Sequence, residues 1–371
     1  MVQQRDLRLD TLRGLLLVLI TINHFGSWSP DGWWITQLTW QPLGYVSAAE
    51  GFVFLSGFIF ATVYLRYSDE PAVLWRKAWQ RAFTIYLYHM ALVLGLAVCF
   101  LILPVYRFVW EAWFFPYHLT PLTSTVASLL LLHQPPYLDI LPMYAVFVFL
   151  SPPILLLLAR RHHGLVLAGS FFLWLLGQLC DPVAVVTRTV FPGHWPGYFN
   201  LLSWQFLYVF GLFLGSKCYR SEPISFLPRQ PVLTLIFFTA FLLFLSRHML
   251  GLPEITMHID RPRLEWLRLT NFFLLTAGIG AIFPHIPLHF HLSWLAFLGK
   301  HSLQVFSFHA GLLYLLVPVS DEIAATVSAA WFTPFILVIV LGLTVPAFLH
   351  SKYKAWVLAS VASKSRYAPT T

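Results

Sequence analysis

The sequence predicts an all-α polytopic membrane protein, a bundle of about ten transmembrane helices with one short re-entrant or interfacial segment. Three observations favour this class. Only 10% of the 371 residues are Asp, Glu, Lys or Arg, whereas a soluble domain carries about 25%. Apolar types make up 58% of the chain and the mean hydropathy is +0.72, which excludes a soluble cytoplasmic enzyme. The apolar residues also gather in runs long enough to cross a bilayer, which takes about 20 residues.

The apolar runs predict ten spanning helices. In chain order they cover about residues 10–27, 46–66, 79–103, 138–160, 163–181, 198–217, 231–247, 267–286, 292–317 and 330–350. The first run lacks a small-residue cleavage site, so it is expected to remain as the first span. A further run, Val126 to Leu132 within residues 122–133, is too short to span, and Pro135 and Pro136 follow it. We interpret it as re-entrant or interfacial; if it does span, every later orientation reverses.

The distribution of the 23 Lys and Arg residues predicts the orientation. With the N-terminus inside, most of them fall in cytoplasmic segments, as the positive-inside rule requires. Both termini are then cytoplasmic, with one membrane-embedded domain over residues 1–355 and a short tail over 356–371. This bias sets orientation and does not indicate nucleic-acid binding. Four exceptions gather in one outer loop, at Arg247, Arg261, Arg263 and Arg268.

The three cysteines predict neither a disulfide framework nor a metal site. Cys99, Cys180 and Cys218 lie far apart and form no CxxC or Cys/His ligand spacing. We therefore expect them to act as small apolar side chains and expect no metal.

Two ionisable residues of the first span predict a functional face. Arg13 and His24 are eleven positions apart, so at 3.6 residues per turn they share one helix face, roughly 16 Å apart along the axis. Arg13 then lies at the cytoplasmic surface and His24 in the outer half of the bilayer. A cation at one end and an acid–base group at the other match the reach of a phosphopantetheine arm. The alternatives are a snorkelling anchor for Arg13 and a packed histidine for His24.

Glu50 is expected near the outer face, at about the depth of His24. It begins the second span, which runs inwards, and a carboxylate beside a histidine fixes its tautomer and raises its basicity. Gly51, Ser56 and Gly57 would allow close helix contact and so bring the first two spans together. The alternative is an interfacial glutamate facing water.

Further polar residues of the spans are expected at the same level. As candidates we take His309 and Tyr144 for catalysis, and Arg268 and Asp139 for substrate binding; each could instead be a helix-end or interhelical hydrogen-bond partner. At the inner mouth, Asp10, Arg13, Arg76 and Arg81 would suit the phosphates and adenosine of coenzyme A, or simply follow positive-inside bias. In the outer loops, Trp33 and Trp40 could stack on sugar rings or belong to an interfacial aromatic belt.

These residues together resemble the OpgC family. The resemblance is collinear over about residues 5 to 350 and is carried by RDLRLDTLRG (5–14), Asn23-His24, AAEGFVFLSG (48–57), YLDILPMY (137–144), DRPRLEWLR (260–268) and FLGKHSLQVF (297–306). The pairing of Arg13 with His24, and a closing Gly-x-x-Ser pattern, also resemble the wider acyltransferase-3 superfamily.

The resemblance implies a ten-span acyltransferase of the bacterial inner membrane. It would move an acyl group, probably succinyl, from cytoplasmic acyl-CoA to glucose hydroxyls of osmoregulated periplasmic glucans, with the lipid bilayer as its surroundings. Our hypothesis for the mechanism is that His24, oriented by Glu50, is the general base, with His309 or Tyr144 as oxyanion donor. Arg268, or a neighbour in the basic outer loop, would bind the succinyl carboxylate. The alternatives are an O-acetyltransferase of another envelope polysaccharide and a membrane transporter or flippase.

Overall fold

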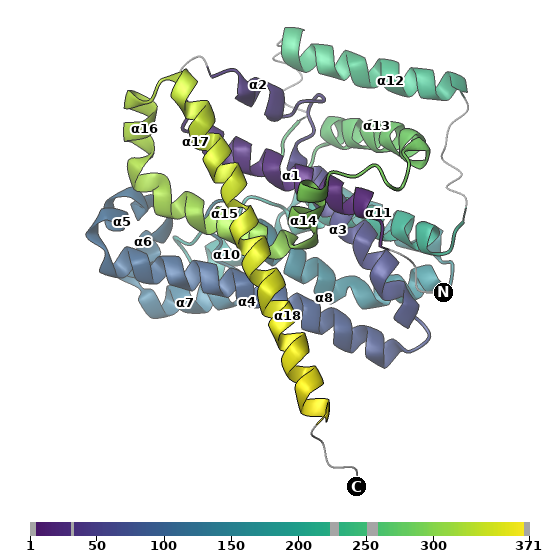
Figure 1. Ribbon diagram of the computed structural model, residues 1–371, viewed down its shortest axis with the longest axis horizontal. Coiled ribbons are helices and arrows are strands. Elements are labelled where there is room, and N and C mark those ends of the chain that lie inside the picture. Colours follow the sequence, from purple (N-terminus) through teal and green to yellow (C-terminus); the bar gives the residue numbers. More distant parts are fainter. Residues whose placement is uncertain (1–4, 31–32, 223–229, 251–258, 367–371) are drawn as a thin grey trace. The chain divides into compact units, whose positions relative to one another are not determined.

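The computed structural model describes residues 5–30, 33–222, 230–250 and 259–366. These ranges fold as helices joined by turns, with no strand among them (Figure 1). The helices are α1 (Leu7–Gly26), α2 (Ile35–Thr39), α3 (Ala48–Tyr64), α4 (Pro71–Ile102), α5 (Pro104–Val109), α6 (Glu111–Leu119), α7 (Pro121–Leu129), α8 (Ile140–Ala159), α9 (His163–Leu179), α10 (Pro182–Val190), α11 (Leu201–Tyr219), α12 (Gln230–Leu245), α13 (Trp266–Ile282), α14 (Ser293–Lys300), α15 (Ser302–Leu316), α16 (Ser320–Thr326), α17 (Ala329–Gly342) and α18 (Thr344–Arg366).

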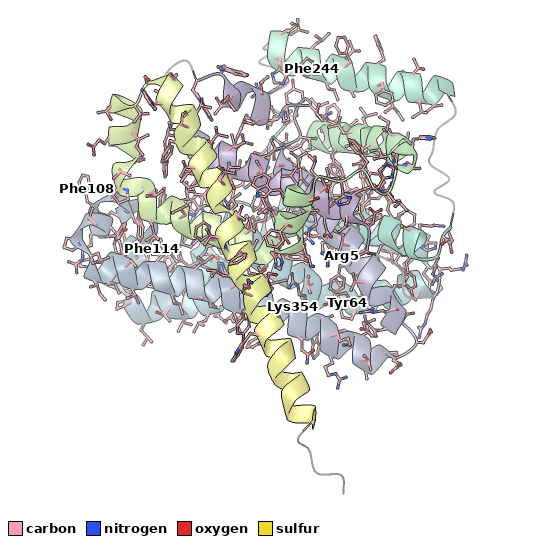
Figure 2. All side chains as sticks on the ribbon, in the orientation of Figure 1. Arg5, Tyr64, Phe108, Phe114, Phe244 and Lys354 are labelled. Carbon is pink, nitrogen blue, oxygen red and sulfur yellow. The ribbon has the colours of Figure 1, made fainter. Side chains whose placement is uncertain are left out.

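The predicted class, a polytopic α-helical membrane protein, is confirmed. Within the described ranges, nine helices are long and apolar enough to cross a membrane, and ten if α9 and α10 form one bent span. The bend of 46° falls at Pro182, which opens α10, and the Asp181 side chain caps that helix by accepting a hydrogen bond from the Ala184 N–H. Phe108, labelled in Figure 2, is 87% exposed, as expected for a ring that faces lipid or the membrane interface.

Two helix boundaries differ from the sequence-based expectation, and one short helix agrees with it. The predicted continuous helix over 292–317 is divided at His301, whose non-helical backbone ends α14 and precedes α15. The last helix continues past the predicted boundary at 355 to Arg366, and residues 367–371 of the predicted tail lie outside the described residues. The segment 122–133 forms the nine-residue α7, which is too short to span.

The chain divides into two compact units, residues 1–36 with 288–371 and residues 37–287. In the first unit, which we call unit 1, α1 packs closely against α14. A Cβ atom at Gly14 would collide with the Leu295 backbone, and one at Gly299 would collide with the Asp10 backbone. The absence of side chains at these two glycines therefore allows the backbones to approach.

In the second unit, unit 2, glycines likewise bring α3 and α11 together. A Cβ atom at Gly57 would meet the carbonyl oxygen of Tyr208, and one at Gly211 would meet that of Phe54. The sequence analysis expected Gly57 to bring the first two spans together. The structure shows that the close contact of Gly57 is with α11 instead.

The close contact at Gly211 predicts that a methyl group added there destabilises the protein, whereas one added at an open glycine does not. We expect Gly211→Ala to lower the free energy of unfolding by about 1–3 kcal/mol, because the added methyl group overpacks against a backbone carbonyl. Gly95→Ala is the matched control, since nothing lies within 4 Å of a Cβ at this position of α4. Thermal unfolding of both variants in the same detergent measures the difference. Equal unfolding midpoints would contradict the close contact.

Candidate active site

The central feature of unit 1 is a pair of histidines. His24 comes from the last turn of α1 and His309 from α15. The Nδ1 atom of His24 and the Nε2 atom of His309 are 2.9 Å apart, and the two rings stack with centroids 5.1 Å apart. The sequence placed both residues at one level of the bilayer; the structure brings them into direct contact.

The hydrogen bonds of this pair fix the positions of its protons. The Nδ1 atom of His309 lies 2.9 Å from the carbonyl oxygen of Phe306, which can only accept, so Nδ1 carries a proton. His309 is 1% exposed, and burial favours its neutral form. Its Nε2 atom is then an acceptor, and His24 must donate from Nδ1. A neutral His24 therefore carries its lone pair on Nε2, the atom that can act as a base.

Asp10 and Arg13 lie near the start of α1 and have defined partners in unit 1. Arg13 is buried and donates a hydrogen bond from Nη2 to the Ser302 hydroxyl at 2.6 Å. Asp10 accepts two hydrogen bonds from the guanidinium of Arg5, at 2.5 and 2.7 Å. Ser302 begins α15, so the break at His301 places this hydroxyl beside Arg13. The sequence analysis did not select Ser302.

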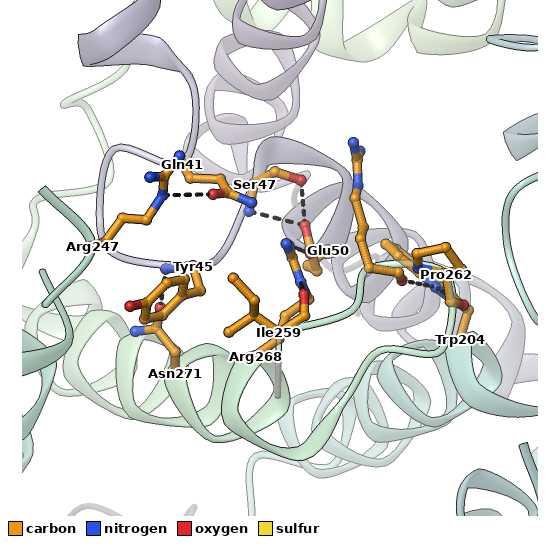
Figure 3. Close-up of polar contacts among 11 residues, drawn as sticks. Gln41, Tyr45, Ser47, Glu50, Trp204, Arg247, Ile259, Pro262, Arg268 and Asn271 are labelled. Carbon is orange, nitrogen blue, oxygen red and sulfur yellow. Dashed lines mark hydrogen bonds and ion pairs between the residues drawn. The ribbon is translucent and has the colours of Figure 1, made fainter. Parts of the chain in front are cut away.

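In unit 2, Glu50 and Arg268 form a buried ion pair (Figure 3). Glu50 is 0% exposed and Arg268 2% exposed, and Nη1 of the arginine lies 2.5 Å from Oε1 of the glutamate. Arg268 also donates to the carbonyl oxygen of Ile259 at 3.2 Å. The other Glu50 oxygen accepts from the backbone N–H and hydroxyl of Ser47, which completes a capping box at the start of α3.

These contacts bear on two sequence-based expectations. Arg268, considered as a partner for a substrate carboxylate, already binds a carboxylate of the protein itself. Glu50 was expected to orient His24, but the two residues belong to different units, and that pairing stays a prediction. Two candidates for the same site are thus found in two local arrangements, a histidine pair and an ion pair.

Asp139 joins the segment before α8 to the segment before α11 by a hydrogen bond. It lies just before α8, and its Oδ2 accepts a hydrogen bond from the Tyr198 N–H at 2.7 Å. Burial raises the pKa of the Asp139 carboxyl to about 6. The residue therefore holds the chain around Tyr198 in place and takes up a proton more readily than an ordinary aspartate.

The raised pKa of Asp139 predicts a stability change with pH. Between pH 4 and 6 the folded protein holds a proton here that the unfolded chain releases, so this contribution is present at low pH and is lost as pH rises through 6. We expect the wild type to lose about 2–3 kcal/mol between pH 4 and 7 relative to Asp139→Asn, which accepts the same hydrogen bond without a charge. Unfolding midpoints of both proteins across that range test it. A constant difference would contradict the raised pKa.

The remaining candidates lie in three other places. Trp33 is buried in unit 1, where its Nε1 donates to the Thr333 hydroxyl at 3.0 Å, so it packs as a core residue. Tyr144 lies in unit 2 with its ring centroid 6.2 Å from that of Tyr208. Arg76 is exposed on α4 and Arg81 half-buried. Trp40 is half-exposed and lies near Arg261, one of the neighbours of Arg268 that the sequence analysis considered for the same role.

One comparison with known proteins identifies a family. A family model described as OpgC protein matches residues 5–355, which is nearly the whole chain. No curated protein and no solved structure matches it.

Proposed function

This chain belongs to the OpgC family, and we propose that it is a transmembrane O-acyltransferase that uses His24 as its general base. Membership indicates an acyltransferase-type function in glucan modification. The finer proposal is transfer of a succinyl group from cytoplasmic succinyl-CoA to glucose hydroxyls of osmoregulated periplasmic glucans, in the bacterial inner membrane. The observation that carries it is the histidine pair, because the hydrogen bond between Nδ1 of His24 and Nε2 of His309 puts the basic lone pair of a neutral His24 on Nε2.

The proposed reaction is a direct transfer. The Nε2 atom of His24 takes the proton of a glucose hydroxyl while the hydroxyl oxygen attacks the thioester carbonyl. The tetrahedral intermediate then collapses, the carbon–sulfur bond breaks, and the coenzyme A sulfur leaves with the proton that His24 returns. The products are a sugar ester and coenzyme A, so atoms and charge balance.

His309 has a different role from the oxyanion donor considered at first. Its only N–H donates to Phe306, and its Nε2 accepts from His24, so it has no proton for an oxyanion. We assign it the positioning of His24, since the hydrogen bond holds the ring and stabilises the imidazolium that forms when the base is protonated. Tyr144 stays the hypothesis for the oxyanion donor.

Arg13 is the proposed contact for a phosphate of acyl-CoA, with Asp10 ordering the neighbouring Arg5. The Ser302 hydroxyl holds the Arg13 side chain, which supports a preformed cationic position at this end of α1. Arg76 and Arg81, on α4, stay predictions for contacts with the same donor.

The phosphate role predicts a specific kinetic pattern for Arg13→Gln. We expect KM for acyl-CoA to rise by about tenfold or more while kcat changes less, because the lost contact binds ground state and transition state alike. Arg8→Gln is the matched control, since Arg8 lies on the same helix but pairs with Asp6 at 2.7 Å. Steady-state kinetics with varied acyl-CoA measures both. A fall in kcat at unchanged KM would argue against the phosphate contact.

The experiment that tests the function is a transfer assay with purified protein in lipid nanodiscs. The protein is given succinyl-CoA and a glucan, and mass spectrometry detects the succinyl ester. Mass spectrometry of periplasmic glucans from cells with and without the gene tests the same point in vivo. Transfer of acetyl alone, or to another envelope polysaccharide, would replace the proposed substrates. Glucan translocation without ester formation would favour a transporter.

A further inference from the structure

A shallow groove runs along one face of α4 in unit 2, with a volume of about 490 Å³. The residues that line it are Ala72, Trp75, Arg76, Trp79, Gln80 and Phe83. They recur every three or four positions, so they form one stripe along the helix. The lining is almost wholly apolar apart from the guanidinium of Arg76 and the amide of Gln80. The groove therefore offers an apolar surface with a cation near one end.

Aromatic rings form the floor of this groove. Trp75 and Trp79 pack edge to face, with ring centroids 5.2 Å apart. Trp79 also stacks on Phe149 of α8, with centroids 5.2 Å apart and ring planes 10° from parallel. Because this stack joins two helices of the same unit, it holds Trp79 in place. Trp79 is nevertheless 45% exposed and Phe83 is 59% exposed, so both rings present a fixed apolar surface to whatever lies beside α4.

The length of α4 places the groove at the edge of the hydrocarbon core. Its 32 residues span about 48 Å at 1.5 Å per residue, whereas the core is about 30 Å thick. Residues 82–102 contain no Asp, Glu, Lys or Arg and are long enough to cross the core. Arg76 then lies at the level of the lipid headgroups, and Phe83 lies where the acyl chains begin. The groove thus runs from the headgroup level into the apolar layer.

The charges at this end of α4 favour an anion. Residues 65–81 contain four Lys or Arg against two Asp or Glu. The cationic groups of Arg66 and Lys77 lie over the ring of Tyr67, 4.8 and 5.0 Å from its centroid. Arg76 is exposed in the groove and has no hydrogen bond or ion pair with another described residue. Its guanidinium therefore keeps its full capacity to bind a phosphate.

We propose that the α4 groove, from Arg76 to Phe83, is a binding site for one anionic phospholipid. The phosphate contacts Arg76, and an acyl chain lies along Trp79 and Phe83. A small soluble anion would leave the aromatic floor unused, and an uncharged apolar molecule would leave Arg76 unused. A phospholipid uses both, and the bilayer supplies it at the right depth. This site does not depend on acyl transfer, and it gives Arg76 a lipid partner in place of the acyl-CoA contact considered above.

The test compares two photoreactive lipids that differ only in the headgroup. Both carry the same diazirine acyl chain; one is a phosphatidylglycerol, which is anionic, and the other a phosphatidylcholine, which has no net charge. The full-length protein is placed in nanodiscs with traces of either probe, and mass spectrometry maps the labelled residues after illumination. The proteins are wild type, Arg76→Gln, Arg76→Lys and the matched control Lys77→Gln. Lys77→Gln removes the same charge one position away, outside the groove lining.

We expect the phosphatidylglycerol probe to label residues 75–83 of the wild type about fivefold more than the phosphatidylcholine probe, the ratio that one basic contact contributes at a membrane surface. Arg76→Gln should bring this ratio close to one. Arg76→Lys should keep part of it, since the charge stays but the planar fork is lost. Lys77→Gln should leave the ratio near that of the wild type. Unchanged labelling by phosphatidylcholine and an unchanged unfolding midpoint show that each variant is folded.

Three results would overturn the inference. Equal labelling by both probes in the wild type would mean that ordinary bilayer lipid covers the groove without selection. Equal losses in Arg76→Gln and Lys77→Gln would mean that a general surface potential attracts the probe and that Arg76 forms no site. Displacement of the phosphatidylglycerol probe by added succinyl-CoA would assign the groove to the acyl-CoA donor instead of a lipid.

Discussion

His24→Ala should lower acyl transfer by about 10²–10⁴-fold, the range that a positioned general base contributes. The variant loses the only group of the histidine pair whose lone pair is directed away from the pair, since the Nδ1 atom of His24 is engaged with His309. Acyl-CoA binding should be largely unchanged, because the proposed donor contact at Arg13 lies at the other end of α1. Initial rates of ester formation, together with equilibrium binding of acyl-CoA, measure the two effects separately.

Two variants sharpen this experiment. His289→Ala removes an exposed histidine of the same unit and should leave the rate unchanged. His309→Ala should reduce kcat by a smaller factor than His24→Ala, because it removes the acceptor that holds the base and not the base itself. Full activity of His24→Ala would eliminate the base assignment. A larger loss for His309→Ala than for His24→Ala would reverse the two roles.

For the histidine pair, the helical period of the sequence predicts the helix face and depth of each residue but not their contact. The spacing of Arg13 and His24 on one helix face follows from 3.6 residues per turn, and hydropathy alone placed His309 at a similar depth. Their contact depends on how α15 is rotated, and α15 begins only after the helix break at His301. The break coincides with the one polar interruption of residues 292–317, Gly299-Lys300-His301-Ser302, which the length of the apolar run led the sequence analysis to include in a single span.

The sequence did not predict which charged residues pair with each other. Glu50 and Arg268 are 218 positions apart, and several cations of the outer loop were equally suitable partners from composition alone. The pairing is set by how α3 and α13, the helices that carry the two residues, pack in unit 2. The rings around Arg261 could not be predicted for the same reason, because Trp40, Tyr198 and Phe199 come from segments that are distant from it in sequence.

The buried ion pair predicts the largest effect on stability. We expect Glu50→Gln to lower the free energy of unfolding by about 3–5 kcal/mol, because it leaves the buried guanidinium of Arg268 without its counter-charge. Glutamine preserves the capping box with Ser47, so the loss reports on charge and not on helix capping. Arg268→Met should cost a similar amount by leaving Glu50 unpaired. Chemical unfolding of purified protein in detergent measures each variant.

The double variant Glu50→Gln/Arg268→Met separates pairing from packing. Once both charges are absent, neither is left uncompensated in the interior, and the double variant should be more stable than either single one. The exposed Arg161, which pairs with Glu222 at 3.1 Å, provides the matched control, and Arg161→Gln should leave the unfolding midpoint unchanged. Strictly additive losses in the cycle would mean that the two side chains stabilise the fold independently. They would then not act as the pair that holds α3 and α13 together.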